Sequence, residues 1–190
     1  MIMNANSQTN FGIQAGLNSS KIKTIHDGKT VDGNSTMTNF YLKGYANIFF
    51  NNNISLQPGI ALISKGGREP SSFATYNYQS LDIPVNILYH VPLTNGSAYV
   101  GAGLFAGMNL SGKIKFDDGG SEDLEFGPIL DSSEDEWKRI DYGINFLTGY
   151  RLSNGFLVNI GYSLGLSDID PRQEWKRNSS VWSFGIGYEF

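Results

Sequence analysis

The sequence of 190 residues contains no cysteine, and few of its residues are charged. The absence of cysteine excludes disulfide bonds and thiolate metal sites. No run of 18 apolar residues occurs, which excludes a transmembrane helix, although a membrane β-strand needs only about 9 to 11 residues. Charged residues make up 17% of the chain and the net charge is -4. Nucleic acid is therefore a poor candidate partner, because its binding depends on neutralising phosphates.

The residues that are abundant favour an all-β chain. Glycine occurs 23 times and aromatic residues make up 13% of the sequence, a composition typical of strands and turns rather than helices. The length indicates one domain. Residues 1–10, MIMNANSQTN, lack the apolar region of a secretory signal. We therefore interpret 1–10 as a mature end or signal remnant and 11–190 as the β-barrel domain.

Apolar and small polar residues alternate with a period of two, as expected for β-strands with one apolar face. In FGIQAGLNSS, Phe11, Ile13 and Leu17 share one face and Gly12 and Gln14 the other. The pattern occurs eight times, at residues 11–20, 40–50, 54–65, 78–91, 98–110, 139–152, 156–166 and 180–190. Pro84 falls inside the fourth segment, where a proline cannot donate to the ladder. We expect it at a bulge or a locally unpaired position.

The connections between these segments alternate in length. Three are short, at residues 51–53, 92–97 and 153–155, and four are long, at 21–39, 66–77, 111–138 and 167–179. Outer-membrane barrels have short periplasmic turns and long external loops. The pattern predicts an eight-stranded antiparallel up-and-down transmembrane β-barrel in a bacterial outer membrane. An even number of strands places both termini in the periplasm.

The distribution of charge predicts which face meets lipid, which alternation alone cannot decide. The second face consists mostly of Gly, Ser and Asn, which suits the crowded lumen of an eight-stranded barrel better than a solvent-exposed surface. The apolar face then contacts lipid, where a closed sheet leaves no unpaired edge. Seven charged residues fall within the expected strands, all on the lumen face: Lys43, Lys65, Asp82, Arg139, Asp141, Arg151 and Glu189.

Aromatic residues near the strand ends predict two interfacial girdles. The periplasmic girdle would contain Phe11, Phe50, Tyr89, Tyr150, Phe156, Tyr188 and Phe190. The external girdle would contain Phe40, Tyr142 and Trp182.

Charges inside a narrow lumen should pair, because an unpaired buried charge is expensive. We expect Lys43, Asp82 and Asp141 in the outer half of the barrel, and Arg151 and Glu189 near the periplasmic mouth. This lumen charge network predicts a plugged barrel with little conductance.

No catalytic, cofactor or metal site is predicted. His26 falls in a long external loop and His90 at the periplasmic end of the fourth strand, pointing inward, with Asp82 too far along the same strand to complete a triad. The 117–136 segment holds nine acidic residues without the EF-hand spacing. We interpret it as a solvated acidic loop rather than a calcium site.

Six segments together resemble a known family: FGIQAGLNSS, ISLQPGIALISKGG, LDIPVNILYHV, AYVGAGLFAG, IDYGINFLTGYRL and FLVNIGYSLGLSDID. They resemble the PorT-like, porin-family outer-membrane β-barrel domain of the Bacteroidota type over nearly the whole chain. The resemblance implies the fold and an outer-membrane location. Family members often carry a glutamate after the proline of the third strand, where this chain has Gly59 after Pro58, so no role of that carboxylate is carried over.

The C-terminal octet SFGIGYEF resembles the insertion signal of outer-membrane proteins, which ends on an aromatic residue. The resemblance implies that the barrel-assembly machinery reads Ser183, Gly185, Tyr188 and Phe190.

The leading functional hypothesis is a non-enzymatic outer-membrane protein, either structural or surface-binding through its long external loops, because loops on a rigid scaffold usually carry recognition. The expected partners are outer-membrane lipid, lipopolysaccharide, the assembly machinery and an unknown extracellular ligand. Three alternatives stay open: a small solute pore, a lipid-modifying barrel enzyme, and a soluble calycin-like carrier of small ligands.

Overall fold

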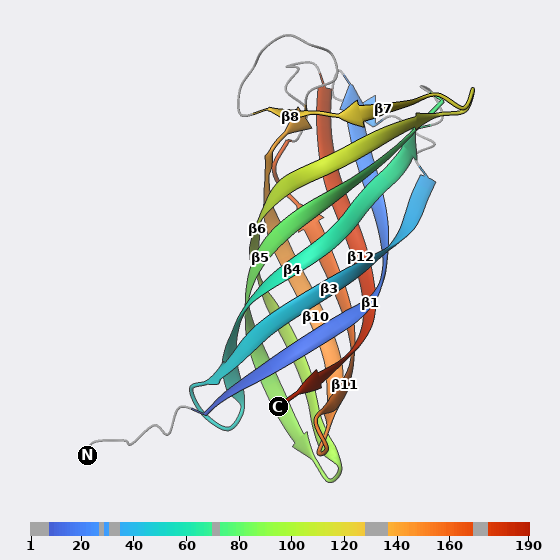
Figure 1. Cartoon of the computed structure of the whole chain (residues 1–190). Helices are drawn as coiled ribbons and strands as arrows, with labels where there is room; N and C mark the ends of the chain where they lie inside the picture. Colours follow the sequence, from blue (N-terminus) through green and yellow to red (C-terminus); the bar gives the residue numbers. More distant parts are fainter. Residues whose placement is uncertain (1–7, 27–28, 31–34, 70–72, 128–136, 169–174) are drawn as a thin grey trace.

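Eight long antiparallel strands form a closed barrel (Figure 1). The computed structural model describes residues 8–26, 29–30, 35–69, 73–127, 137–168 and 175–190. Neighbouring strands of the sequence pair with each other, β12 pairs with β1, and β10 pairs with β6, so that no long strand is left as an edge. The long strands are β1 (Thr9–His26), β3 (Ser35–Phe49), β4 (Ile54–Glu69), β5 (Ala74–Leu93), β6 (Gly96–Phe116), β10 (Ile140–Leu152), β11 (Phe156–Gly165) and β12 (Trp175–Glu189).

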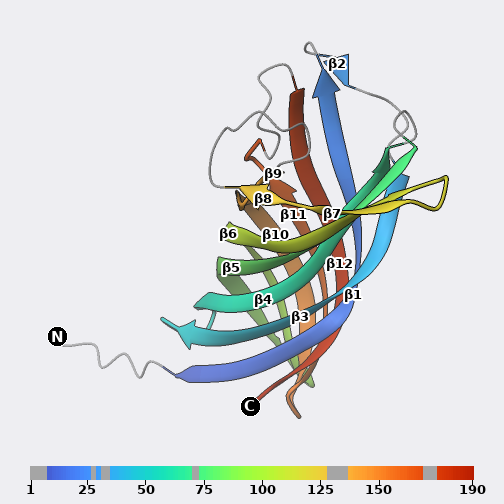
Figure 2. The ribbon, with the colours of Figure 1, turned by 45° about the horizontal axis from the view of Figure 1, so that its top comes forward.

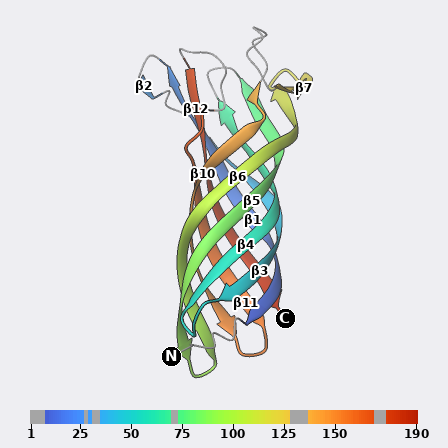
Figure 3. The ribbon, with the colours of Figure 1, turned by 90° about the vertical axis from the view of Figure 1, so that its left-hand side faces the viewer.

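The fold class predicted from the period-two pattern is confirmed, but most strands are longer than expected. β5 and β6 stay paired from Leu93↔Gly96 to Ala74↔Phe116, well beyond the apolar segments that revealed them. β1 already begins at Thr9, and His26, which we expected in a loop, is its last residue. Figure 3, a side view, shows that the strands are strongly tilted relative to the barrel axis. Among the residues that the structure describes, no helix is long and apolar enough to cross a membrane.

The two ends of the barrel differ, as the connection lengths predicted. The start of β1 and the C-terminus lie at one end (Figure 1), together with the short turns after β3, β5 and β10; we call it the short-turn end. The opposite, long-loop end carries β2 (Lys29–Thr30), β7 (Ser121–Leu124), β8 (Phe126–Gly127) and β9 (Trp137–Lys138). β7 folds back on β6 as a hairpin that reaches away from the barrel (Figure 2).

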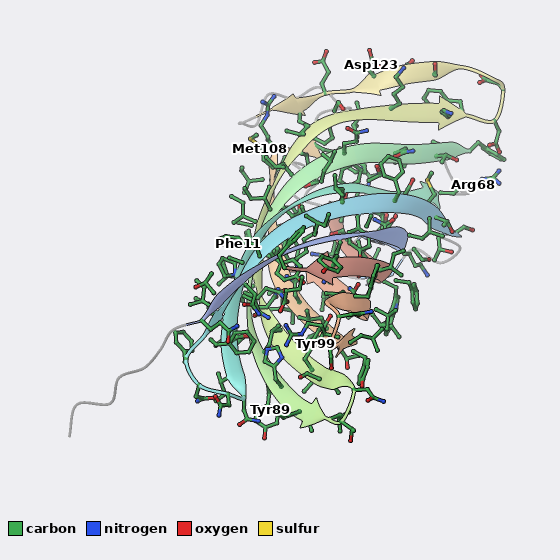
Figure 4. The ribbon with its side chains drawn as sticks, turned by 60° about the horizontal axis from the view of Figure 1, so that its bottom comes forward. Phe11, Arg68, Tyr89, Tyr99, Met108 and Asp123 are labelled. Atoms are coloured by element: carbon green, nitrogen blue, oxygen red, sulfur yellow. The ribbon has the colours of Figure 1, made fainter. Side chains whose placement is uncertain are left out.

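The apolar face points outward and the polar face inward. Leu104 and Ile186 are 66% and 69% exposed, whereas Gln14 and Asn109 are 2% and 0% exposed. Figure 4 shows Phe11 and Met108 on the outside of the ribbon and Tyr99 on the inside. A soluble carrier would bury its apolar rows, so the calycin-like alternative is wrong. Within the expected aromatic girdles, every residue is exposed except Tyr150 and Tyr188, which are half-buried.

Pro84 lies at a locally unpaired position, as predicted, and without a bulge. The β4–β5 ladder is interrupted between the pairs Pro58↔Val85 and Ala61↔Asp82, which flank Pro84. On its other side Pro84 stays in register with Phe105 of β6. The gap fits a residue that has no N–H to donate.

Candidate functional site

The inside of the barrel holds a buried charge cluster built around Lys65. Its Nζ lies 3.0 Å from Asp82 Oδ2 and 3.3 Å from Asp141 Oδ2, and 5.0 Å from the centre of the Phe105 ring. Lys65 is 2% exposed, Asp82 4% and Asp141 0%. One ammonium from β4 thus joins two carboxylates from β5 and β10, across the inside of the sheet.

Serine hydroxyl groups also donate to the carboxylate oxygens of this cluster. Ser80 Oγ donates to Asp82 Oδ1, while Ser167 and Ser179 donate to the two oxygens of Asp141. A buried carboxylate needs such partners, because each unmet hydrogen bond costs free energy. The Lys65 cluster, defined as Lys65, Asp82 and Asp141 with these three serines, therefore ties β4, β5, β10, the segment after β11, and β12 together.

The expected lumen charge network needs a correction at Lys43. Lys43 is buried on the lumen face, but its Nζ donates to Gln57 Oε1 at 2.7 Å and lies over the Tyr45 ring, instead of pairing with Asp82 or Asp141. Lys65 holds those carboxylates. Sequence reasoning placed Lys65 on the correct face but at the very end of its strand, and the strand in fact continues to Glu69.

Arg139 also departs from the expected position. It is exposed, and its guanidinium donates to the carbonyl oxygen of Phe126 at 2.7 and 3.2 Å. The backbone bends at Arg139, between β9 and β10, so the period of two does not extend to it. Its side chain consequently leaves the lumen face.

At the short-turn end, Glu189 collects the polar contacts. Arg151 Nη1 donates to Glu189 Oε1 at 2.5 Å, and Tyr45, Asn47 and Asn10 donate to the same carboxylate at 3.1 to 3.3 Å. Arg151 and Glu189 thus lie together near this mouth. The contacts draw on β1, β3, β10 and β12.

A serine and a histidine meet in the same layer, which sequence reasoning missed. Ser55 Oγ lies 2.8 Å from His90 Nε2 and 2.6 Å from Asn47 Oδ1. The register of β4 and β5 brings Ser55 and His90 together although they are 35 positions apart in the chain. Ser55 is 0% exposed and His90 4%, so the hydroxyl has no surface from which to attack a substrate.

A buried apolar cluster lies toward the long-loop end of the barrel. Trp137 stacks on Tyr76 with 5.1 Å between ring centroids, and it meets Tyr78 edge-on at 5.6 Å. The buried guanidinium of Arg177 lies over Tyr76 and Trp137, at 5.6 and 5.4 Å from their centroids. We call these residues the aromatic cap; its buried apolar members are Ile22, Ala74, Tyr78, Ile114, Leu124, Phe126 and Trp137.

Below the cap, β1 and β4 approach each other directly. The β3–β4 register shifts between Thr36 and Tyr41, and no pairs form across that stretch. Side chains of β1 bridge it: Asn18 Nδ2 donates to the carbonyl of Ser64 at 2.9 Å, and Ser20 Oγ bonds both backbone groups of Gly66 at 2.9 Å. These contacts join β1 directly to β4.

The acidic 117–136 loop is only partly described. Asp117 pairs with Arg68 at 2.6 Å on the surface, and Glu122 and Asp123 lie on the exposed β7 hairpin. Asp131, Glu134, Asp135 and Glu136 lie outside the described residues. Within the part of the chain that the structure describes, no three His, Asp or Glu side chains are placed to hold a metal ion.

The residues of the expected insertion signal differ in environment. Gly185 faces the lumen, where an added Cβ would collide with the Tyr41 hydroxyl and lie 3.0 Å from the carbonyl of Ala15. Ser183 is half-buried. Tyr188 packs against Phe156 and Phe190 at 5.2 and 5.1 Å between centroids, and Phe190 is 72% exposed.

Comparison with known families supports the location that this geometry suggests. Residues 4–170 match the model of the outer membrane protein beta-barrel domain family. The chain belongs to this family. The bacterial outer membrane is therefore where the exposed apolar surface meets lipid.

Solved outer-membrane barrels share the fold. The attachment invasion locus protein Ail of Yersinia pestis is 19% identical, with 96% of this chain and 99% of that chain covered and a TM-score of 0.50. OprG of Pseudomonas aeruginosa is 14% identical, with 97% of both chains covered and a TM-score of 0.51. Comparison with curated protein sequences finds no match.

Proposed function

We propose that this protein is a non-enzymatic outer-membrane barrel with a closed lumen, which acts at the cell surface through its long-loop end. The observation that carries the proposal is the Lys65 cluster, in which one ammonium, two carboxylates and three serine hydroxyl groups bond to one another across the inside of the barrel. The aromatic cap and the β1–β4 contacts lie beyond it on the way to the long-loop end. Solute would have to break these contacts to pass.

Planar-bilayer recording tests the closure. Protein refolded into detergent, and shown to be folded by its heat-modifiable gel migration, should insert without steady single-channel currents. Steady, large currents from the wild-type protein would establish the small-pore alternative instead. A Trp137→Ala variant provides a comparison, because it removes the largest ring of the cap and leaves the Lys65 cluster intact.

We propose that the protein is not an enzyme because Ser55 and His90, the pair that resembles a nucleophile and its base, are buried. Ser55 is fully enclosed and already bonded to Asn47 and His90. The lipid-modifying alternative needs a nucleophile and a base at the lipid-facing rim, whereas His90 faces the lumen. Radiolabelled phospholipid incubated with the refolded protein should remain unmodified, and turnover that is lost in Ser55→Ala would contradict this.

Basic residues outside the barrel favour lipopolysaccharide as a partner. On β1 the outward row changes from apolar Leu17 to exposed Lys21 and Lys23, and on β6 from Leu110 to exposed Lys113 and Lys115. The change marks the level where the phosphates of the outer leaflet lie, and ammonium groups bind phosphate by charge-assisted hydrogen bonds. The short-turn end, with both termini, then faces the periplasm.

The lipid contact can be tested by stability in defined vesicles. Lipopolysaccharide should raise the urea midpoint of the wild type, and this gain should be largely lost when Lys21, Lys23, Lys113 and Lys115 are all replaced by Gln. Changing Glu122 and Asp123 to their amides on the β7 hairpin provides the control, and it should keep the gain. An equal gain in the lysine variant would exclude these residues as the contact.

The remaining partners follow from sequence patterns. We assign the C-terminal residues Ser183, Gly185, Tyr188 and Phe190 to recognition by the barrel-assembly machinery, and the chain to the PorT-like subtype of its family. The external loops are the place for an extracellular ligand, because a rigid barrel presents them on the cell surface.

A further inference from the structure

A cavity of about 80 Å3 lies in the middle of the lumen, lined by residues from all eight long strands. A water molecule needs roughly 10 to 15 Å3 of such space, so the cavity has room for several waters or for one small ion with part of its hydration shell. Its wall combines rings and aliphatic groups with one ammonium, that of Lys43, one carboxylate, that of Asp82, and several side-chain amides, those of Gln14, Asn18, Asn86, Asn145 and Asn159.

The charge of Lys43 has no carboxylate partner among the described residues. Its Nζ contacts the neutral amide of Gln57 and the face of Tyr45. Asp82 also lines the cavity, but Lys65 and Ser80 already bind its oxygens. A cation that is 9% exposed is costly without an opposite charge, because burial removes the hydration that stabilises it.

A second donor from the neighbouring strand can reach the same space. Gln14 of β1 is directly opposite Lys43 of β3 in the ladder, and both side chains point into the lumen. Side chains opposite each other in an antiparallel pair start about 4.5 to 5.5 Å apart. Gln14 is 2% exposed, and its Nε2 has no hydrogen-bond partner among the described residues. A buried N–H without a partner is a donor that an anion can use.

We propose that the cavity beside Lys43 binds one small monovalent anion of halide size, held by the Lys43 ammonium and the Gln14 amide. The ion supplies a negative charge in contact with the Lys43 ammonium, whose partners among the described residues, Gln57 and Tyr45, are neutral. Asn18 Oδ1, a buried acceptor without a partner, accepts a hydrogen bond from a water of the ion's shell. This site does not depend on whether the barrel conducts.

Anomalous diffraction from crystals grown in sodium bromide tests the proposal. The wild type should show a bromide peak in hydrogen-bond contact with Lys43 Nζ. Gln57→Glu provides the sharpest comparison, because Gln57 Oε1 already lies 2.7 Å from that nitrogen. The substitution keeps the size of the side chain and gives Lys43 a carboxylate, so the peak should be lost. Lys43→Met should also lose it.

A solution measurement covers variants that do not crystallise. The excess line width of the chloride-35 resonance, measured with detergent-solubilised protein, should fall to the level of empty micelles in both variants, after their heat-modifiable migration has shown that they are folded. Water alone beside Lys43, bromide only on the surface, or a peak that persists in Gln57→Glu would each overturn the proposal. The bilayer recording above judges closure independently of these results.

Discussion

Replacing Lys65 with Met should destabilise the barrel more than any other single charge removal considered for this chain. Met keeps most of the length of the side chain and removes the ammonium that lies 3.0 and 3.3 Å from two buried carboxylates. Within the part of the chain that the structure describes, Asp82 and Asp141 would then keep only the hydroxyl groups of Ser80, Ser167 and Ser179 as donors. Removing one partner of a buried ion pair costs about 3 to 5 kcal/mol, because the remaining charge stays buried.

That free energy corresponds to a fall in the ratio of folded to unfolded protein by a factor between about 100 and about 4,000, since roughly 1.4 kcal/mol is a factor of ten. The assay is urea unfolding of protein refolded into lipid vesicles, followed by tryptophan fluorescence. Trp182 is 50% exposed on the outer face of β12, so its emission reports transfer from lipid to water.

Two comparisons separate the buried charge from general damage. Arg68→Met removes a pair of similar length, Arg68 to Asp117 at 2.6 Å, whose side chains are 50% and 42% exposed, and it should cost about 1 kcal/mol or less. Adding Asp82→Asn and Asp141→Asn to Lys65→Met should recover most of the loss, because no charge is then left alone. A Lys65→Met loss as small as that of Arg68→Met would refute the reasoning.

Three further predictions concern packing, assembly and the cap. Gly185→Ala should lower the free energy of unfolding by about 1 to 3 kcal/mol in the urea assay, because the added Cβ would collide with Tyr41. Gly44→Ala should be close to neutral, because nothing lies within 4 Å of the added Cβ. Equal effects of the two substitutions would contradict this explanation. Phe190→Ala should lower the amount of barrel assembled in cells several-fold while the refolded protein keeps nearly the wild-type urea midpoint, and unchanged assembly would exclude a signal role. Trp137→Ala should raise hydrogen exchange in β8 and β9 but not around the turn between β10 and β11, since the ring is 3% exposed in the aromatic cap; uniform exchange would show that the cap is not a separate unit.

The strands that cross the membrane were predictable because lipid outside requires apolar side chains and a narrow lumen inside requires small polar ones, so the two kinds alternate along each strand. Gly12 and Gln14 could therefore be placed inside, and Phe11 and Ile13 outside, from local sequence alone. This alternation ends where the strand leaves the membrane. His26 and Phe116 lie in strands that continue beyond the apolar belt, where no alternation of hydrophobicity marks them.

The charged pairs in the lumen were only partly predictable. Period two assigns Lys43, Lys65, Asp82 and Asp141 to one face, but pairing depends on the stagger between strands and on how far each strand runs. Asp141 reaches Lys65 from a strand 76 positions away in the sequence. The Ser55–His90 contact and the Trp137 cap have the same origin, since each joins segments whose register only the closed sheet determines.

The amino-acid sequence by itself determined that this chain forms eight strands, each with an apolar and a polar face, because the alternation is a property of each strand separately. Only the closed structure decided which charge meets which, since the tilt and register of all eight strands jointly set the level at which each side chain enters the lumen. Lys43 illustrates the difference: its place inside follows from its own strand. That no carboxylate of the described residues contacts its ammonium follows from the position of Lys65 on the next strand.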